Sequence, residues 1–425
     1  MILIKLLIVS YVLLLSNSVI AHTGLQSSIP SNGDVLKEAP KVIELSYGGP
    51  INLIKVELKG ADGNVIDVDI PSDNMARKHF TLPLTDIQTS AYQVSWISAG
   101  ADGHKITGKF AFKYIATNAV ENELENDNVE FINEGISPWA LVSSLNKLFL
   151  YIALAMTIGG LSAKFTLSRS SNHHTQHIRY ILMGCILGVF TACLSFFLQV
   201  GAFTEEGIAG MWSLDFMPIL WDSGAGQALR FQLIGWGLIL MTLFMHLKIR
   251  FNYIFLVLSL IGSLIIATSF SLTGHTAEAP LWVKISLILH VAIAMWWMGL
   301  LYPLRSACDV LDTSNLQSLM IDFGKKAIFL VCLLIALGVG VAYHLEGSIS
   351  NLLFTGHGNV LLLKLVSVAV ILLIATKHKL RLVPSLTNLK AVLILKRSIT
   401  IEMIIGFIIL LITTVLSSLV GPAYS

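Results

Sequence analysis

Residues 92–114 read Tyr92-Gln93-Val94-Ser95-Trp96-Ile97-Ser98-Ala99-Gly100-Ala101-Asp102-Gly103-His104-Lys105-Ile106-Thr107-Gly108-Lys109-Phe110-Ala111-Phe112-Lys113-Tyr114. Apolar and polar side chains alternate at the beginning and at the end of this segment, which is the pattern of half-buried β-strands. The tetrapeptide 101–104 interrupts the alternation and has the composition of a turn. We therefore predict two strands joined by a segment that carries a carboxylate and an imidazole.

The same alternation recurs upstream, at residues 42–47 and 54–58. Asn32-Gly33 and Asp62-Gly63 supply turn signals. Short strands at this spacing predict a small all-β sandwich or barrel over residues 22–115. The chain's cysteines all lie outside this region, so no disulfide framework is expected there: they are Cys185, Cys193, Cys308 and Cys332.

Residues 1–21 have the pattern of a secretory signal peptide. Lys5 lies near the start, an apolar run covers residues 6–15, and small residues lead up to Ala21. Cleavage after Ala21 would make His22 the first residue of the mature chain, with a free α-amine beside its imidazole. Asp102 and His104 would add a carboxylate and a second imidazole. A nitrogen-rich set with one carboxylate favours Cu(II), which accepts tetragonal N and O ligands.

This region resembles the copper-resistance protein C (CopC) family. The resemblance lies in residues 28–36, in Ala39-Pro40 and in residues 94–110 with their Asp-Gly-His motif. It implies an immunoglobulin-like β domain that binds Cu(II) outside the cytoplasm through His22, Asp102 and His104. His79 is a further candidate, but it follows Arg77 and Lys78, and a solvated loop histidine is the preferred interpretation.

The remaining chain is built for a membrane, because hydrophobic residues make up 55% of the sequence and charged residues only 13%. Residues 116–137 form an acidic linker without Lys or Arg. Eight apolar runs follow, each long enough to cross a hydrocarbon core of about 30 Å. They cover residues 138–163, 178–201, 227–247, 252–272, 281–301, 325–343, 358–376 and 399–419, within a helical domain of residues 138–420.

The loops after the first, third, fifth and seventh runs are rich in Lys and Arg, whereas the loops after the second, fourth and sixth runs hold no Lys or Arg apart from those at helix ends. The positive-inside rule places the first set in the cytoplasm. We therefore expect a multi-pass protein of the cytoplasmic membrane, with the β domain and the C-terminus outside. Because the basic residues lie in short loops, nucleic acid is not an expected partner. Glycines within the runs are predicted to mark packing faces: Gly159, Gly160, Gly184, Gly235 and Gly237.

Ionisable residues at membrane depth are costly and usually functional. His290 lies within the fifth run, in a segment (289–300) that resembles copper-resistance protein D (CopD). Residues 355–364, 379–384 and 395–402 carry the same resemblance, which implies copper movement across, or handling at, the membrane. The chain thus resembles a CopC/CopD fusion. Candidate residues for a copper path are His275, His290, His344, His357, Met295 and Met298, since imidazoles bind both copper oxidation states and thioethers favour Cu(I).

The sequence leaves three alternatives open. The buried histidines could hold haem in a membrane redox protein, drawing on His246, His275, His290, His344, His357 and His378. The β domain could buffer or sense copper while the helices only anchor it. The N-terminal histidine could belong to an oxidative copper enzyme, although a non-enzymatic role is preferred. No nucleotide-binding motif occurs, so transport would be passive, driven by the membrane potential or coupled to a partner such as another copper-resistance protein.

Overall fold

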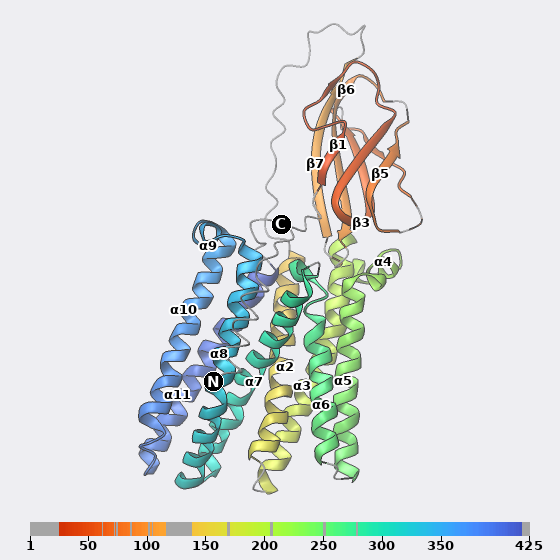
Figure 1. The fold of residues 1–425 in the computed structure, drawn as a ribbon. Coiled ribbons are helices and arrows are strands. Elements are labelled where there is room, and N and C mark those ends of the chain that lie inside the picture. The colour runs from red at the N-terminus through yellow and green to blue at the C-terminus, as the bar shows by residue number, and fades with distance from the viewer. Residues whose placement is uncertain are drawn as a thin grey trace. The chain divides into compact units, whose positions relative to one another are not determined.

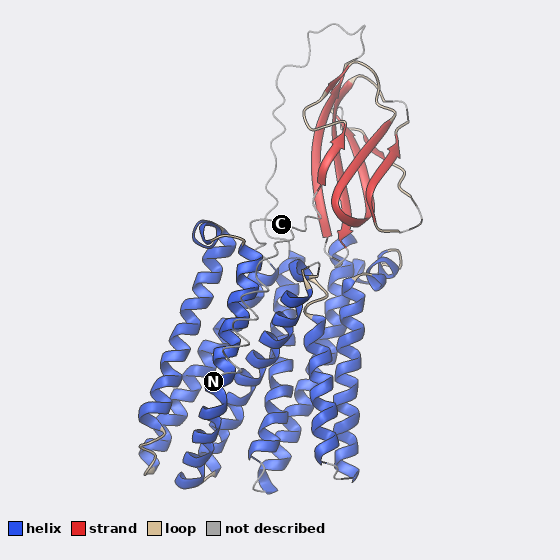
Figure 2. Cartoon of the chain, in the orientation of Figure 1, coloured by secondary structure: helices blue, strands red, loops and turns tan. Residues whose placement is uncertain are grey.

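The computed structural model describes residues 25–61, 63–71, 73, 75–85, 87–100, 103, 105–115, 138–167, 171–204, 207–249, 252–277 and 279–418. The predicted signal peptide, the predicted linker and three expected ligands, His22, Asp102 and His104, lie outside these residues. Within them, strands occupy the N-terminal part of the chain and helices the remainder (Figure 2). The fold class expected from the sequence is therefore confirmed: a β-sheet domain followed by a helical membrane region.

The β domain contains β1 (Leu25–Ile29), β2 (Val35–Leu36), β3 (Val42–Gly60), β4 (Val65–Asp67), β5 (Arg77–Pro83), β6 (Ser90–Gly100) and β7 (Lys105–Tyr114) (Figure 1). The first half of β3 pairs with β1 and β5, and its second half pairs with β4 and β6. Strand β6 continues into the antiparallel hairpin with β7, which pairs in parallel with β2.

Strand β3 is one bent strand where the sequence predicted two separate runs. Gly48-Gly49-Pro50 lies between those runs and resembles a turn signal. Pro50 lacks a backbone N–H, yet it is tolerated because it falls where the pairing with β5 shifts register and the pairing with β6 begins at Ile51. A second register shift, between Leu53 and Lys55, bends the strand again. The bends let one strand serve both groups of neighbours.

The core of the β domain takes side chains from both groups of strands. Leu45 of β3 and Phe80 of β5 pack in the same cluster as Val94 and Trp96 of β6 and Phe112 of β7. These buried positions alternate with half-buried or exposed ones along most of β3, β6 and β7, as the sequence pattern predicted. Burial of this apolar area is the main force that holds the domain together, since no cysteine lies within it.

Gly108 is required by the packing of Trp96, its cross-strand neighbour. A Cβ atom at Gly108 would lie 2.1 Å from the Trp96 ring. Gly108→Ala should therefore destabilise the domain by about 1–3 kcal/mol, because the rigid indole must move within a packed core. Thermal unfolding of the variant should show a lower melting temperature, whereas Thr107→Ala, at an exposed neighbouring position, should melt like the wild type. Equal melting of Gly108→Ala and wild type would contradict this packing argument.

Within the described residues, the helical region has eight long helices: α2 (Pro138–Leu167), α3 (Ser171–Thr204), α5 (Gly224–Ile249), α6 (Asn252–Ser269), α7 (Leu281–Val310), α8 (Thr313–Glu346), α10 (Gly356–Lys377) and α11 (Leu389–Ser418). Each overlaps one predicted run. Seven of them are long and apolar enough to cross a membrane, and the described apolar part of α6, Ile254–Ser269, is shorter. The short helices are α4 (Phe216–Asp222), α9 (Ile349–Phe354), the 3₁₀ turns η1 (Gly207–Trp212) and η2 (Gly274–Thr276), and the π-helical turn η3 (His378–Leu382).

Helix α8 begins at Thr313, twelve residues before its predicted run, and Asp312 is its N-cap. Side-chain hydrogen bonds from Ser314 and Asn315 lower the pKa of Asp312 to about 2, so the cap stays ionised at neutral pH. The helix has 34 residues, which corresponds to a length of about 50 Å. Because this exceeds the hydrocarbon thickness, the first turns of α8 extend beyond the membrane core.

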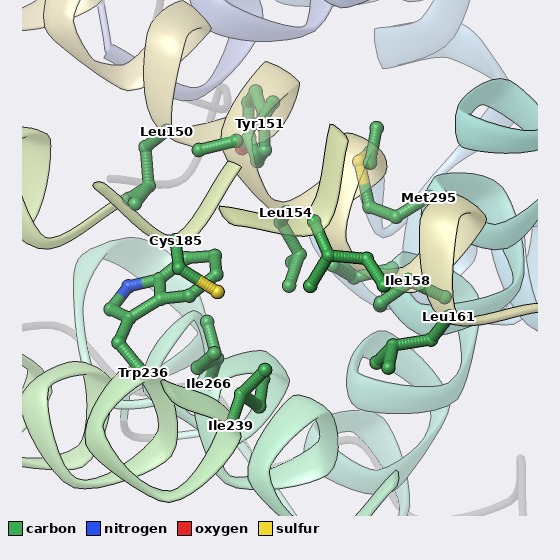
Figure 3. Close-up of a cluster of buried hydrophobic side chains, with 14 of the residues drawn as sticks. Leu150, Tyr151, Leu154, Ile158, Leu161, Cys185, Trp236, Ile239, Ile266 and Met295 are labelled. Atoms are coloured by element: carbon green, nitrogen blue, oxygen red, sulfur yellow. The ribbon is translucent and has the colours of Figure 1, made fainter. Parts of the chain in front are cut away.

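Helix α7 contributes to both hydrophobic clusters of the helical region. Met295 belongs to the cluster formed with Leu154 of α2, Cys185 of α3 and Trp236 of α5 (Figure 3). Trp297 belongs to the second cluster, which α7 forms with α8, α10 and α11. Two residues of one helix thus face two different groups of helices, which makes α7 central to the packing of the region.

Close helix contacts confirm the predicted packing role of four glycines. A Cβ atom at Gly159 would lie 2.1 Å from the backbone of Gly299, and a Cβ atom at Gly160, Gly184 or Gly235 would lie 2.7, 2.6 or 2.5 Å from a side chain of a neighbouring helix. Gly237 is the exception, because no atom lies within 4 Å of its Cβ position. The prediction is wrong for Gly237, which marks no contact in the part of the chain that is described.

Candidate metal centre

The described residues that lie nearest in sequence to the expected copper ligands pair with the middle of β3. Strand β1 begins at Leu25, which pairs with Tyr47, and β6 ends at Gly100, which pairs with Ile51. Tyr47 and Ile51 are four residues apart, or about 13 Å along an extended strand. Leu25 and Gly100, which are far apart in sequence, therefore lie at the same part of the sheet.

A tight connection follows Gly100. Ala99 pairs with Lys105, so residues 101–104 join the two strands of a hairpin. The N–H of Gly103 donates to the carbonyl oxygen of Gly100 over 2.9 Å, and Gly103 has a φ of +82°. This backbone conformation favours glycine, which explains its place between Asp102 and His104.

His79 lies next to the same part of β3. It is on strand β5, where it pairs with Ser46, and Ser46 pairs with Ser27 of β1 on its other side. The His79 Nδ1 atom is 3.0 Å from the Ser46 hydroxyl, and the side chain is exposed. The sequence-based interpretation of a loop histidine is therefore wrong about the element, although it is right about exposure.

In the helical region, His290 of α7 is held against α8. Its Nδ1 atom lies 3.0 Å from the carbonyl oxygen of Leu334, and its ring covers Gly338, whose Cβ position is 2.8 Å from Cε1. Because a carbonyl oxygen only accepts hydrogen bonds, Nδ1 carries the proton and Nε2 keeps its lone pair. This is how proteins fix the tautomer of a metal-binding histidine, by a hydrogen bond from the other ring nitrogen.

The other candidates for a copper path lie in different surroundings. Met295 is 4% exposed and packs in the core of Figure 3, whereas Met298 faces Gly406 of α11. The His344 ring meets the Trp282 ring edge to face, with centroids 5.8 Å apart. His275 lies in η2, and its side chain is outside the described part. Among the described residues no three His, Cys, Asp or Glu side chains form a metal-binding group.

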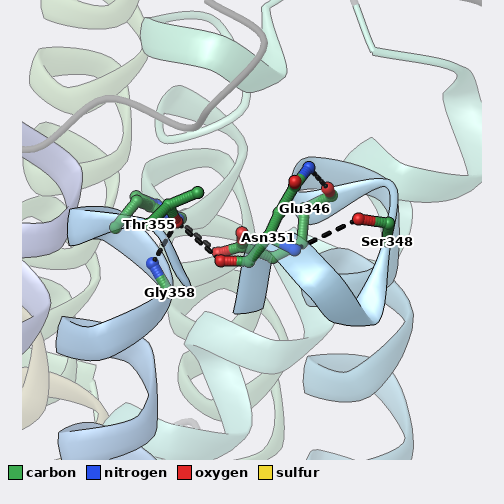
Figure 4. A network of polar contacts seen from close by, with 6 residues as sticks. Glu346, Ser348, Asn351, Thr355 and Gly358 are labelled. Carbon is green, nitrogen blue, oxygen red and sulfur yellow. Dashed lines mark hydrogen bonds and ion pairs between the residues drawn. The ribbon is translucent and has the colours of Figure 1, made fainter. Parts of the chain in front are cut away.

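His357 is buried against a carboxylate at one end of α10. Its Nδ1 atom is 2.5 Å from Oε1 of Glu346, the last residue of α8, and both side chains are 5% exposed. Figure 4 shows the contacts that hold this corner: the Asn351 side chain donates to the Glu346 carbonyl, and the Thr355 hydroxyl accepts from the N–H of Gly358. His357 therefore has a carboxylate partner that the sequence did not reveal.

A second buried pair lies at the other end of α10. His378 Nδ1 is 3.3 Å from Oε1 of Glu402 on α11, and His378 Nε2 is 2.6 Å from the Ser398 hydroxyl. Sequence reasoning considered His378 only as a haem ligand and missed Glu402. The available signal was a lone carboxylate inside the last apolar run.

Comparisons with known proteins match two separate parts of the chain to families. Residues 25–115 match the model of the CopC domain, and residues 317–416 match the model of copper resistance protein D. The chain is 23% identical over 434 residues to the copper transport protein CutJ of Bacillus subtilis strain 168, an alignment that covers 97% of this chain and 76% of that protein. The crystal structure of CopC from Methylosinus trichosporium OB3b is 21% identical and covers 23% of this chain and 99% of its own, with a TM-score of 0.21.

Proposed function

Because the chain joins a CopC domain to a segment of the copper resistance protein D family, we propose that it binds copper outside the cytoplasm and transports it across the cytoplasmic membrane. The copper transport protein CutJ, which aligns with 97% of this chain, supports the same role. Copper is the cargo of this process rather than a resident cofactor. The seven long apolar helices supply the membrane-spanning part.

The proposal that the chain binds copper rests on the register in which β1 and β6 pair with the middle of β3. We propose His22, Asp102 and His104 as the Cu(II) ligands, with the α-amine of a processed His22 as a further nitrogen ligand. His22 is three residues before Leu25, and Asp102 and His104 follow Gly100 closely, so short connections suffice to bring them together. Two imidazoles, one amine and one carboxylate match the preference of Cu(II) for nitrogen and oxygen ligands.

We propose that the β domain and the C-terminus lie outside the cytoplasm, because Lys and Arg are concentrated in the alternate loops that the positive-inside rule assigns to the cytoplasm. His290 is the membrane residue that we propose first as a copper contact. Its Nε2 lone pair is free of the hydrogen bond that Nδ1 makes to Leu334. His275, His344, His357 and Met298 remain proposed contacts along the path, whereas the buried position of Met295 favours a packing role.

His290→Ala should lower copper uptake by cells several-fold without changing Cu(II) binding by the outer domain, because the substitution removes one contact within the bundle only. Metal content measured by mass spectrometry, at matched protein levels, checks this expectation. Phe190→Ala, which removes an exposed side chain of α3 that has no metal-binding atom, is the control and should leave the copper content unchanged. Normal copper content in His290→Ala cells would leave His290 as a packing residue between α7 and α8.

Transport itself is tested with the full chain in proteoliposomes. Copper added outside should enter vesicles that contain the protein, and should not enter protein-free vesicles. Entry equal to that of empty vesicles would leave copper binding without transport. The same preparation gives an absorption spectrum, in which a Soret band would indicate haem and would contradict the proposed copper role of the buried histidines.

A further inference from the structure

The π-helical turn η3 holds a histidine against the neighbouring helix α11. In this turn the N–H of Val383 donates to the carbonyl oxygen of His378 over 2.9 Å, five residues back. His378 is 6% exposed, while Lys377 and Lys379 on either side are exposed. Turns of this kind are rare in helices and occur frequently at functional sites.

Two residues of α11 receive the His378 ring, one at each nitrogen. Ser398 and Glu402 are four residues apart and therefore lie on one face of the helix. The Ser398 hydroxyl is 2.6 Å from Nε2, and Glu402 Oε1 is 3.3 Å from Nδ1. The second contact is close but poorly aligned, so Oε1 has no hydrogen-bond partner within the described residues although Glu402 is only 3% exposed.

The surroundings of this pair are apolar, because Leu395 and Ile399 of α11 are almost fully buried beside it. Two basic residues near the pair, one on α7 and one on α11, have other partners, and Arg397 of α11 is exposed, as are Lys379 and Arg381 of η3. Arg305 donates to the Thr400 hydroxyl over 2.9 Å, and Lys396 lies 2.5 Å from Asp309. Lys377, the residue before His378, is exposed and makes no recorded ion pair with Glu402. Within the described part of the chain, His378 is thus the basic residue that contacts the Glu402 carboxylate.

An ionised carboxylate in such a place is costly unless a positive charge compensates it. With neutral His378 and ionised Glu402 the pair carries one negative charge, and one added proton makes it neutral. A metal cation that arrives beside the pair supplies the same compensation. A proton or a nearby metal cation would therefore each compensate the negative charge of the pair.

We propose that His378 and Glu402 form a proton-binding site through which metal movement across the bundle is exchanged for protons. The inference rests on the proposed copper transport and adds its driving force. Glu402 carries the proton beside a neutral His378 ring; the proton leaves for water when the metal ion arrives, and it returns when the metal ion departs. No electrons are transferred in this exchange.

Infrared difference spectroscopy of the full chain in detergent tests the proton directly. The wild type minus Glu402→Gln spectrum at neutral pH should contain the band of a protonated carboxyl group, and the band should shift in heavy water. Asp309→Asn, which removes an exposed carboxylate at the same end of the bundle, should leave that band in place. Absence of the band would overturn the proposal. If Glu402→Gln fails to fold, Ser398→Ala must shift the band, and an unshifted band has the same consequence.

Proteoliposomes test the coupling. Copper(I), kept reduced under anaerobic conditions, is added to vesicles with an imposed pH difference. For exchange of one proton, the steady-state ratio of inner to outer copper should rise about tenfold for each unit by which the interior is more acidic. The ratio in Glu402→Gln vesicles should change less than twofold. Copper entry that ignores the pH difference in the wild type would overturn the exchange and leave transport intact, whereas no entry at all would overturn the proposed function.

Discussion

One alanine placed before His22 should weaken Cu(II) binding by the mature chain by roughly ten- to a hundredfold, since changes at or around metal ligands have effects of this size. The insertion turns the α-amine of His22 into a peptide nitrogen and removes one ligand, while the imidazole stays. Asp102→Ala and His104→Ala should weaken binding to a similar extent. Competition titration of the full chain against a chelator of known affinity measures each value.

Two variants serve as controls for this prediction. Thr23→Ala changes the neighbouring residue but keeps the free amine of His22, so it should bind Cu(II) like the wild type. His79→Ala removes the exposed imidazole that lies next to the same part of β3. Weaker Cu(II) binding by this variant would make His79 a fourth nitrogen ligand, and unchanged binding would exclude it from the site. An affinity that the added alanine leaves unchanged would refute the proposed ligand set.

Gly299→Ala should strongly destabilise the helical region, because the added methyl group meets backbone rather than a side chain. A Cβ atom at Gly299 would lie 1.8 Å from the carbonyl oxygen of Ala155 and 2.9 Å from Cα of Gly159. The backbone of α2 cannot rotate away as a side chain can, so α2 and α7 must separate. Close approach through small residues is a principal source of helix association in membranes. We expect a loss at or above the upper end of the usual overpacking range of about 1–3 kcal/mol.

The matched control is Gly237→Ala, because no atom lies within 4 Å of the Cβ position of Gly237. Alanine has the higher helix propensity, so this variant should be unchanged or slightly more stable, by up to about 1 kcal/mol. Melting of the detergent-solubilised proteins, followed by size-exclusion chromatography after heating, compares the two variants. Similar melting temperatures for Gly299→Ala and Gly237→Ala would show that the contact of α2 with α7 does not limit stability.

Local sequence patterns predicted the long helices and several strands of this fold, but not β5, where His79 was interpreted as a loop residue. Alternation gave the strands of the 92–114 hairpin, and apolar length gave the positions of the long helices. The single course of β3 was not predictable, because Gly48-Gly49-Pro50 has the composition of a turn and only the pairing with β5 and β6 keeps it in one strand. The start of α8 was missed because polar residues follow its cap at Asp312, so hydropathy did not mark it.

The partners of the membrane histidines were beyond the reach of sequence patterns. Glu346 ends α8 and His357 lies in α10, after the intervening helix α9, whereas His378 pairs with Glu402 of α11. Neither pair has a sequence separation that a regular helix or strand would bring into contact. Likewise, only the structure shows that Met295 faces the core while Met298 faces Gly406 of α11. The convergence of the β1 start and the β6–β7 connection follows from strand register, which one sequence does not specify.

Electron paramagnetic resonance of the purified, processed full chain loaded with one equivalent of Cu(II) tests the central claim most directly. The account predicts one tetragonal Cu(II) centre per chain whose spectrum shows coupling to several nitrogen nuclei, and loss of part of that coupling in His104→Ala. Cu(II) that stays in solution, or a bound ion with oxygen ligands only, would contradict it.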